Sequence, residues 1–357
     1  MRPIIHNKII IATIGPSCES INLLLQMKRS GVEIFRVNMS HSSIKDLIKF
    51  AKIGKENNLR IGLDTEGGQI RTFLYDRNFI NLNEGDKFKI RNNYDQSNDK
   101  DFVLYPDKTI DKLDKGFKIR LDFNGACAEV ISKEKSYLDC VCLSSGLVGN
   151  NKGVDILNKN IVLPDFTEKD IRSFDILETE GIKDVFISFC KSKDAIMRIK
   201  NINDNIFVTS KIESKASINN LQSICQVSDA LLIDRGDLTR EINILDIPFA
   251  QRGIIKVANS YDKPCFVATN IFESLLKGNL PTRAEINDIV GTIEMGAAGL
   301  VLAAETAIGK KPLLCVEIIK ELIHRYSLHK DGLLFADLDR NEITDEEMRL
   351  WLNRNYK

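Results

Sequence analysis

The chain has 357 residues, of which 43% are hydrophobic and 28% are charged. This balance excludes a disordered chain and is typical of a globular protein with about two domains. Lys and Arg together number 50, as do Asp and Glu, so the net charge is zero. We therefore expect no binding to nucleic acid and no attachment to an anionic membrane through a basic surface.

Cysteine and histidine usage restricts the compartment and the metal chemistry. The 8 Cys residues include no Cys-x-x-Cys pair, and the presence of only 4 His residues argues against a multi-histidine metal site. We interpret the cysteines as reduced core residues of a cytoplasmic protein. The sequence shows no apolar run of about 18 residues that would span a membrane, and its N-terminus lacks the apolar stretch of a signal peptide.

The chain begins with strands and helices in alternation. Strands are predicted at 8–13, 33–38 and 60–65. Segments with helical periodicity lie between them, from Ile21 to a stop at Gly31 and over about 43–57. This rhythm indicates parallel βα units.

Helical periodicity is lost from about 73 to 160. Only short β runs separated by polar turns remain, at 87–90, 117–121, 128–131 and 138–141. The sequence therefore predicts a small β domain that is inserted after the third strand.

The alternation resumes at Leu163 and continues to about 330. Strand-like runs end at Phe189, Ser210, Ile233, Ala268 and Ala304, and helices are predicted at 167–180, 192–201, 215–226, 247–261, 284–296 and 312–327. Three units before the insert and five after it give the count of a closed (β/α)₈ barrel, with a doubly wound sheet as the alternative. The predicted domains are a barrel over 1–72 and 161–330, the insert over 73–160, and a polar tail over 331–357 with a short helix that carries Trp351.

Polar side chains follow the predicted strands at the end where a barrel places reactive groups. The residues at these strand ends are Gly15 and Pro16 after the first strand, and then the polar residues Arg36, Asn38, Ser40, Asp64, Thr65, Arg71, Lys211, Glu213, Arg235, Asp237, Thr269, Glu305 and Thr306. Each alone is equally consistent with a turn or a cap. Their coincidence at one rim of the barrel is the functional signal.

Lys211, Glu213 and Asp237 carry the sharpest chemical prediction. Lys211 and Glu213 are two residues apart at a strand end, so their side chains point the same way, and Asp237 follows the next strand. Two carboxylates on adjacent strands suit Mg²⁺, and a neighbouring lysine suits a phosphoryl group or an oxyanion. Arg36 and Arg71 are candidates for phosphate binding. A buried salt bridge is the structural alternative for the first three residues.

Short motifs with this chemistry recur along most of the chain. They lie at 13–16, 36–41, 63–65, 70–72, 210–213, 235–238, 268–269, 273–274, 281–285 and 305–307. In type and order they resemble those of the pyruvate kinase family, over about residues 8–325. The resemblance implies an α/β fold, a (β/α)₈ TIM barrel with a small β-barrel lid domain inserted after the third strand. It also implies a homo-oligomer, and its regulatory C-terminal domain is expected to be missing because the chain ends soon after the eighth unit.

The resemblance further implies transfer of the phosphoryl group of phosphoenolpyruvate to ADP, through a Mg-bound enolate, to give pyruvate and ATP. It assigns Mg²⁺ or Mn²⁺ to Glu213 and Asp237, and K⁺ to Asn38, Ser40, Asp64 and the Thr65 carbonyl. Lys211 would neutralise charge on the phosphoryl group and the enolate, Arg36 would bind phosphate, and Thr269 would lie beside the enolate carbon. Backbone N–H groups of Gly236 and Asp237 would bind the substrate carboxylate. The nucleotide would lie between barrel and lid, near Pro16, His41 and Lys152.

Several residues beside the predicted site depart from the family pattern. Where the family usually reads Asp-Thr-Lys-Gly-Pro-Glu-Ile-Arg, this chain has Glu66, Gly68 and Gln69, and Asp234 replaces a small residue before Arg235. The charge changes weaken binding of an anionic substrate unless an extra cation compensates, so Glu66→Lys is expected to strengthen it. Gly68 is expected to loosen its loop. Two alternatives to a pyruvate kinase stay open, a related enzyme for another enol phosphate or 2-oxo acid, and a catalytically degenerate binding protein.

Overall fold

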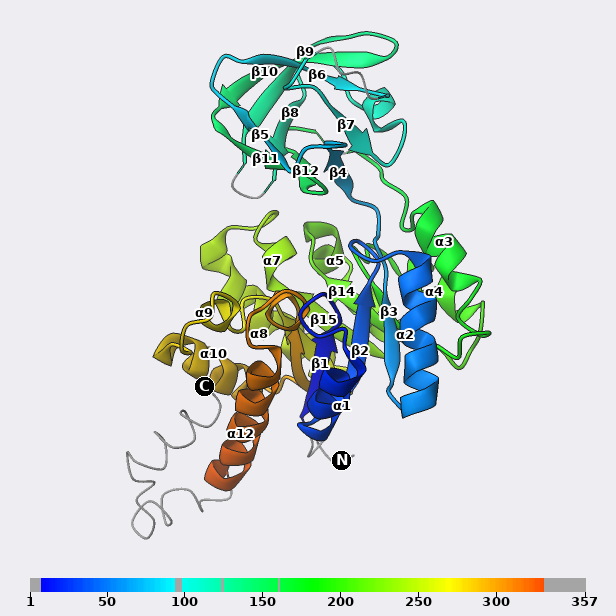
Figure 1. Cartoon of the computed structure of the whole chain (residues 1–357), viewed down its shortest axis with the longest axis vertical. Coiled ribbons are helices and arrows are strands. Elements are labelled where there is room, and N and C mark those ends of the chain that lie inside the picture. Colours follow the sequence, from blue (N-terminus) through cyan, green and yellow to red (C-terminus); the bar gives the residue numbers. More distant parts are fainter. Residues whose placement is uncertain (1–7, 94–97, 123–124, 160, 331–357) are drawn as a thin grey trace. The chain divides into compact units, whose positions relative to one another are not determined.

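The computed structural model describes residues 8–93, 98–122, 125–159 and 161–330 (Figure 1). The predicted tail over 331–357 and its helix at Trp351 lie outside the described residues. The chain divides into two compact units, Met1–Glu66 with Glu168–Lys357 and Gly67–Thr167.

The first unit is built on a closed barrel of eight parallel strands. Around the barrel these are β1 (Ile9–Thr13), β2 (Val32–Asn38), β3 (Ile61–Asp64), β13 (Asp184–Ile187), β14 (Phe207–Ile212), β15 (Ala230–Asp234), β16 (Cys265–Ala268) and β17 (Gly299–Leu302). Closure between β1 and β17 excludes the doubly wound sheet and confirms the predicted (β/α)₈ fold. Apolar side chains such as Ile11, Phe186 and Leu232 fill the barrel as a buried cluster, so polar groups gather only at its rim.

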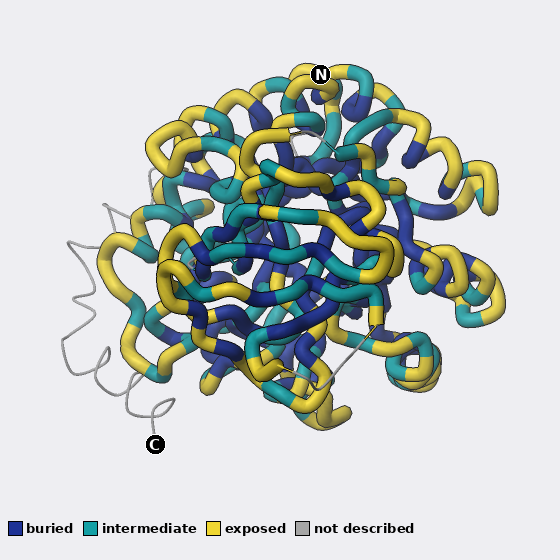
Figure 2. The backbone as a smooth tube through the Cα atoms, turned by 90° about the horizontal axis from the view of Figure 1, so that it is seen from above, coloured by how far each residue is buried: buried dark blue, intermediate teal, exposed yellow. Residues whose placement is uncertain are grey.

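Helices follow the strands of the first unit. They are α1 (Ile21–Arg29), α2 (Ile44–Asn57), α3 (Glu168–Phe174), α4 (Lys193–Lys200), α5 (Lys215–Asn219), α6 (Leu221–Val227), α7 (Arg235–Leu238), α8 (Ile247–Ser260), α9 (Glu273–Leu276), α10 (Arg283–Glu294), α11 (Ala304–Ala307) and α12 (Pro312–Lys330), with a 3₁₀ turn at Ile244–Asp246. Buried and exposed residues alternate along them, as expected of amphipathic helices (Figure 2).

Two helical predictions are corrected by the structure. The segment predicted as one helix over 215–226 is α5 and α6, which meet at Asn220. The helix predicted over 167–180 ends at Phe174, and turns follow it. Among the described residues, no helix is long and apolar enough to cross a membrane.

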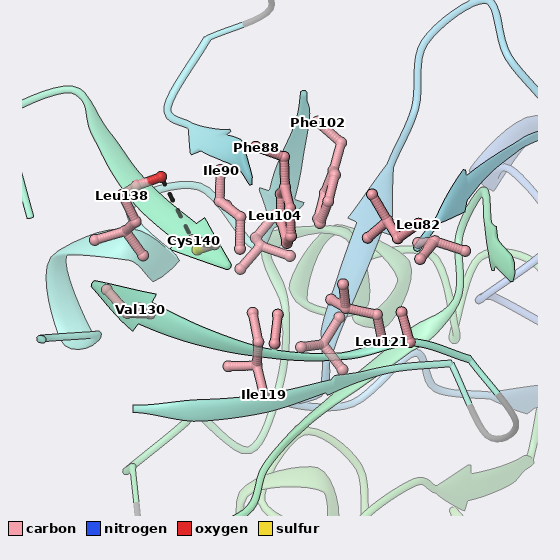
Figure 3. Close-up of a cluster of buried hydrophobic side chains, with 14 of the residues drawn as sticks. Leu82, Phe88, Ile90, Phe102, Leu104, Ile119, Leu121, Val130, Leu138 and Cys140 are labelled. Atoms are coloured by element: carbon pink, nitrogen blue, oxygen red, sulfur yellow. Dashed lines mark hydrogen bonds between the residues drawn. The ribbon is translucent and has the colours of Figure 1, made fainter. Parts of the chain in front are cut away.

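The second unit contains a closed barrel of seven short strands and a two-stranded sheet. The barrel order is β10 (Tyr137–Ser144), β6 (Lys87–Arg91), β7 (Phe102–Tyr105), β4 (Ile70–Phe73), β12 (Gly153–Ile156), β8 (Lys118–Leu121) and β9 (Cys127–Lys133), and β5 (Phe79–Leu82) pairs with β11 (Gly146–Gly149). A 3₁₀ turn lies at Thr109–Lys112. Figure 3 shows the core, in which Phe88 and Phe102 stack with ring centroids 5.6 Å apart. Strand β4 belongs here, rather than with the barrel over 1–72, because it pairs antiparallel with β7 and β12.

Gly68 lies where the backbone of the second unit approaches itself closely. A Cβ at this position would be 1.8 Å from the carbonyl oxygen of Pro164. The structure therefore replaces the expectation of a loosened loop with a packing reason for glycine at this position.

Gly68→Ala is expected to destabilise the protein by about 1–3 kcal/mol, the usual cost of overpacking. Urea unfolding measures this effect. Gly253→Ala in α8 is the matched control, because nothing lies within 4 Å of the added Cβ, and it is expected to stabilise by about 0.5–1 kcal/mol. Equal effects of the two substitutions would contradict the close approach at Gly68.

Candidate active site

Lys211 lies at the centre of the charged rim of the first unit. It is carried by β14 and is 5% exposed. Its Nζ lies 3.2 Å from Glu213 Oε2, 3.5 Å from Asp64 Oδ1 and 3.8 Å from Asp234 Oδ2. Burial acts to lower the pKa of Lys211, but the three carboxylates outweigh it, so the pKa is raised and the lysine stays charged. The predicted proximity of Lys211 and Glu213 is present.

Three carboxylates form a group that fits a divalent cation. One oxygen each of Glu213, Asp234 and Asp237 lie within 4.8 Å of one another. Glu213 Oε1 accepts a hydrogen bond from the Phe189 N–H at 2.6 Å, whereas its buried Oε2 pairs with Lys211 and accepts no hydrogen bond. Burial raises the pKa of Glu213, Lys211 lowers it, and Asp237 and Asp234 raise it further. Oxygen ligands and excess negative charge are what Mg²⁺ or Mn²⁺ requires.

Arg36 on β2 extends the charged network toward β1 and β3. Its Nε and Nη2 donate to Thr13 Oγ1 at 3.2 and 2.9 Å, and its Nη1 lies 3.2 Å from Asp64 Oδ2. Asp64 therefore lies between two cations, Arg36 and Lys211. Asn38 Oδ1, another predicted K⁺ ligand, accepts the Ser40 N–H at 2.9 Å, and β2 and β3 pair Asn38 with Asp64.

Ser188 is a site residue that the sequence analysis missed. Its Oγ lies 2.6 Å from the Thr65 carbonyl oxygen and 3.2 Å from Asp64 Oδ1, and it accepts a hydrogen bond from Lys211 Nζ at 3.0 Å. Ser188 follows β13, the only barrel strand whose end was not searched for polar residues. Reading that end as the others were read would have found it.

Ser188→Ala is expected to destabilise the protein by about 1–3 kcal/mol, because it leaves buried polar groups without their partner. Urea unfolding of the variant measures this. Ser173→Ala is the matched control, since the buried Ser173 hydroxyl donates to the Lys169 carbonyl within its own helix, α3, at 2.8 Å. A smaller loss of stability in Ser188→Ala than in Ser173→Ala would contradict a role for Ser188 in joining Lys211 to Asp64 and Thr65.

Thr269 and Asp234 meet above β15 and β16. Thr269 has φ 65°, and its Oγ1 accepts the Gly236 N–H at 2.8 Å and lies 3.0 Å from Asp234 Oδ1. Asp234 Oδ1 also accepts the Asp237 N–H, at 3.5 Å, and so caps α7. The two N–H groups that were predicted to bind a substrate carboxylate are therefore directed at side chains of this chain.

Other predicted rim residues hold the loops in place. Glu305 accepts the backbone N–H groups of Ile271, Phe272 and Ala303. Arg235 pairs with Asp288 at 2.6 Å and donates to the Thr269 carbonyl. Their role is to position the residues that carry the site.

The predicted nucleotide-binding residues fall in both units. Pro16 and His41 are exposed in the first unit, and Lys152 is exposed in the second. Arg71 also belongs to the second unit, where its Nη1 donates to the Asn151 carbonyl at 3.1 Å.

Glu66 has a cationic neighbour that the sequence analysis did not identify. Its Oε1 lies 3.7 Å from Lys169 Nζ, and its backbone N–H donates to Asp170 Oδ1 at 2.7 Å. Glu66 is buried, and Lys169 also donates to the Met39 carbonyl. Lys169 is thus a compensating cation for one of the three charge departures.

Comparison with known proteins agrees with this geometry. Residues 5–316 match the family model described as pyruvate kinase, barrel domain. The chain is 29% identical over 346 residues to a pyruvate kinase of Thermotoga maritima, covering 94% of this chain and 74% of that protein. It is 31% identical over 326 residues to one of Sporosarcina psychrophila, covering 88% of this chain but only 56% of that protein.

A solved structure gives the same result for the fold. The crystal structure of Cryptosporidium parvum pyruvate kinase superposes with a TM-score of 0.83 at 27% identity, covering 90% of this chain and 70% of that one. Because the family model matches residues 5–316, the assignment rests on most of the chain rather than on a single motif. The chain therefore belongs to the pyruvate kinase family.

Proposed function

We propose that the chain is a pyruvate kinase-like phosphotransferase that converts phosphoenolpyruvate and ADP into pyruvate and ATP in the cytoplasm. The observation that carries the proposal is the buried Lys211, charged and surrounded by Glu213, Asp64 and Asp234 at the barrel rim. A fixed cation in a site of low dielectric is suited to stabilise charge that develops on a phosphoryl group and on an enolate oxygen.

Each site residue has its own role in the proposed reaction. The bond from phosphorus to the enol oxygen breaks as the phosphoryl group passes to a β-phosphate oxygen of ADP, and the resulting enolate takes a proton at its methylene carbon. Lys211 would hold positive charge beside both groups, and Arg36 would bind the phosphoryl oxygens. Thr269 Oγ1 would lie beside the carbon that is protonated. Arg71 is proposed to bind phosphate together with Arg36, and Pro16, His41 and Lys152 are proposed to contact the nucleotide.

Glu213 and Asp237 would hold Mg²⁺ or Mn²⁺, which supplies charge neutralisation to the phosphoryl oxygens when it is bound. Asn38, Ser40, Asp64 and Thr65 are proposed to hold K⁺. We also propose a homo-oligomer.

A related activity on another enol phosphate or 2-oxo acid is the second candidate. The observation that favours it is Asp234, whose carboxylate accepts the Asp237 N–H and adds negative charge where a substrate carboxylate is expected. A substrate with less negative charge would fit such a site better.

A coupled assay for pyruvate and ATP tests the proposal. Phosphoenolpyruvate and ADP are supplied with Mg²⁺, with and without K⁺, and the full chain is compared with Lys211→Met. Turnover that the variant loses supports a pyruvate kinase. A folded protein that binds Mn²⁺ but transfers no phosphoryl group contradicts that activity and supports the second candidate, which is then assayed with other 2-oxo acids.

A further inference from the structure

We propose that Asp234 is a third carboxylate ligand of the cation site, so that this chain holds a divalent cation more tightly than Glu213 and Asp237 alone would. The proposal rests on the proposed function only for the presence of a divalent cation. It deepens that function because it assigns a ligand beyond Glu213 and Asp237.

Strand pairing places Asp234 beside Glu213. Strands β14 and β15 are parallel neighbours with Ile212 opposite Ile233, so the residues that follow in each strand share the rim. Asp234 is 6% exposed. One of its oxygens belongs to the group that lies within 4.8 Å together with an oxygen of Glu213 and one of Asp237.

Contacts on both carboxylate oxygens hold the Asp234 side chain in this position. Its Oδ1 lies 3.0 Å from Thr269 Oγ1 and 3.5 Å from the Asp237 nitrogen. Its Oδ2 lies 3.8 Å from Lys211 Nζ, on the side where Lys211 also approaches Glu213 Oε2 at 3.2 Å. A ligand whose rotamer is fixed by other contacts loses little entropy when it binds a cation.

Capping of α7 alone does not account for an acid at this position. Ser, Thr or Asn caps a helix as well as Asp does, without placing another charge in a buried cluster. The described ion pairs set Asp64, Glu213 and Asp234 against Lys211 and Arg36, and Asp237 against Arg240. These pairs leave one negative charge in excess, and Glu213 Oε2 has Lys211 Nζ at 3.2 Å as an ion-pair partner but accepts no hydrogen bond. A divalent cation at this position would neutralise the excess negative charge.

A third carboxylate ligand affects how tightly the cation binds. Mg²⁺ is commonly held by one or two carboxylates together with substrate phosphates, and affinity rises with the number of charged ligands. A third carboxylate is therefore expected to raise the affinity of the site for the ion when no substrate phosphate is present.

Mn²⁺ is the probe, and the free Mn²⁺ signal in electron paramagnetic resonance measures binding to the full chain without substrate or nucleotide. Asp234→Asn keeps the shape and removes the charge, and Asp234→Ala introduces a small residue. Both are expected to weaken Mn²⁺ binding by on the order of tenfold or more, because residues that merely support a ligand already cost that much. Circular dichroism establishes that each variant is folded.

Asp229→Asn is the matched control. It removes the same charge from the residue directly before β15, at the opposite end of the strand from Asp234, where Asp229 pairs with Lys200 at 2.8 Å. It is expected to leave Mn²⁺ affinity unchanged. Wild-type affinity in folded Asp234→Asn or Asp234→Ala overturns the proposal, as does equal loss in Asp229→Asn. Tight Mn²⁺ binding without phosphoryl transfer leaves this proposal standing and overturns the proposed pyruvate kinase activity alone.

Discussion

Lys211→Met is expected to reduce phosphoryl transfer by on the order of 10³-fold, the loss typical of removing a group that stabilises transition-state charge. The lysine is the group that approaches Asp64, Glu213 and Asp234 together. Methionine has a similar length and no charge, so it removes the electrostatic contribution with little change in volume. The turnover number at saturating phosphoenolpyruvate, ADP and Mg²⁺ measures the effect. A variant that retains most of its rate would exclude Lys211 from the chemical step.

The same substitution is also expected to lower stability, by about 3–5 kcal/mol, the cost of breaking a buried ion pair. The structure surrounds Lys211 with buried carboxylates, and these lose their counter-charge when the lysine is replaced. Lys200→Met is the control, because Lys200 pairs with Asp229 in a half-exposed position. Lys211→Arg keeps the charge and is expected to lose activity with less loss of stability, since a planar guanidinium differs in shape from an ammonium.

The barrel could be predicted because its signal is repeated eight times. Each buried strand is a short apolar run, and each amphipathic helix separates it from the next, so errors of two residues at one end leave the count intact. Strand β14 ends at Ile212 rather than Ser210, and β17 ends at Leu302 rather than Ala304. The count, rather than any boundary, determined the fold.

The second unit was predicted less completely. Strands β5, β7, β11 and β12 have four residues each and were not identified. Four residues contain only two per face, so an alternating pattern is weak in them, and among the described four-residue strands of this unit only β8 was predicted. Strand β4 was misassigned because its partners lie far along the chain, and pairing of this kind is absent from local periodicity.

In the candidate site, too, some contacts could be predicted from local sequence and others could not. Lys211 and Glu213 could be placed together because residues two apart on a strand share a face. The contact between Glu66 and Lys169 could not be predicted, because it joins a loop after β3 to a helix that follows the inserted domain. The direction of Asp234 toward the Asp237 N–H likewise depends on how the chain turns into α7.

Glu66→Lys is expected to destabilise the protein. Contrary to the expectation from sequence, it is not expected to strengthen substrate binding. Glu66 is buried and its Oε1 lies 3.7 Å from Lys169 Nζ, so a lysine at this position would be placed beside another cation. The expected loss is about 3 kcal/mol, the lower end for a broken buried pair, because Lys169 is 30% exposed and water screens part of the charge. Urea unfolding measures it.

The double variant Glu66→Lys/Lys169→Glu separates charge pairing from size. It restores opposite charges, so a coupling energy of about 0.5–3 kcal/mol is expected in a double-mutant cycle. Lys55 and Glu180, which lie 3.6 Å apart at a more exposed position, form the control pair, for which the same exchange should recover less. If Glu66→Lys alone were neutral in stability and strengthened phosphoenolpyruvate binding, Glu66 would act directly on the substrate and its contact with Lys169 would be incidental. If only the exchange recovers stability, Lys169 is the cation that allows a negative charge at position 66 in a site for anionic substrates.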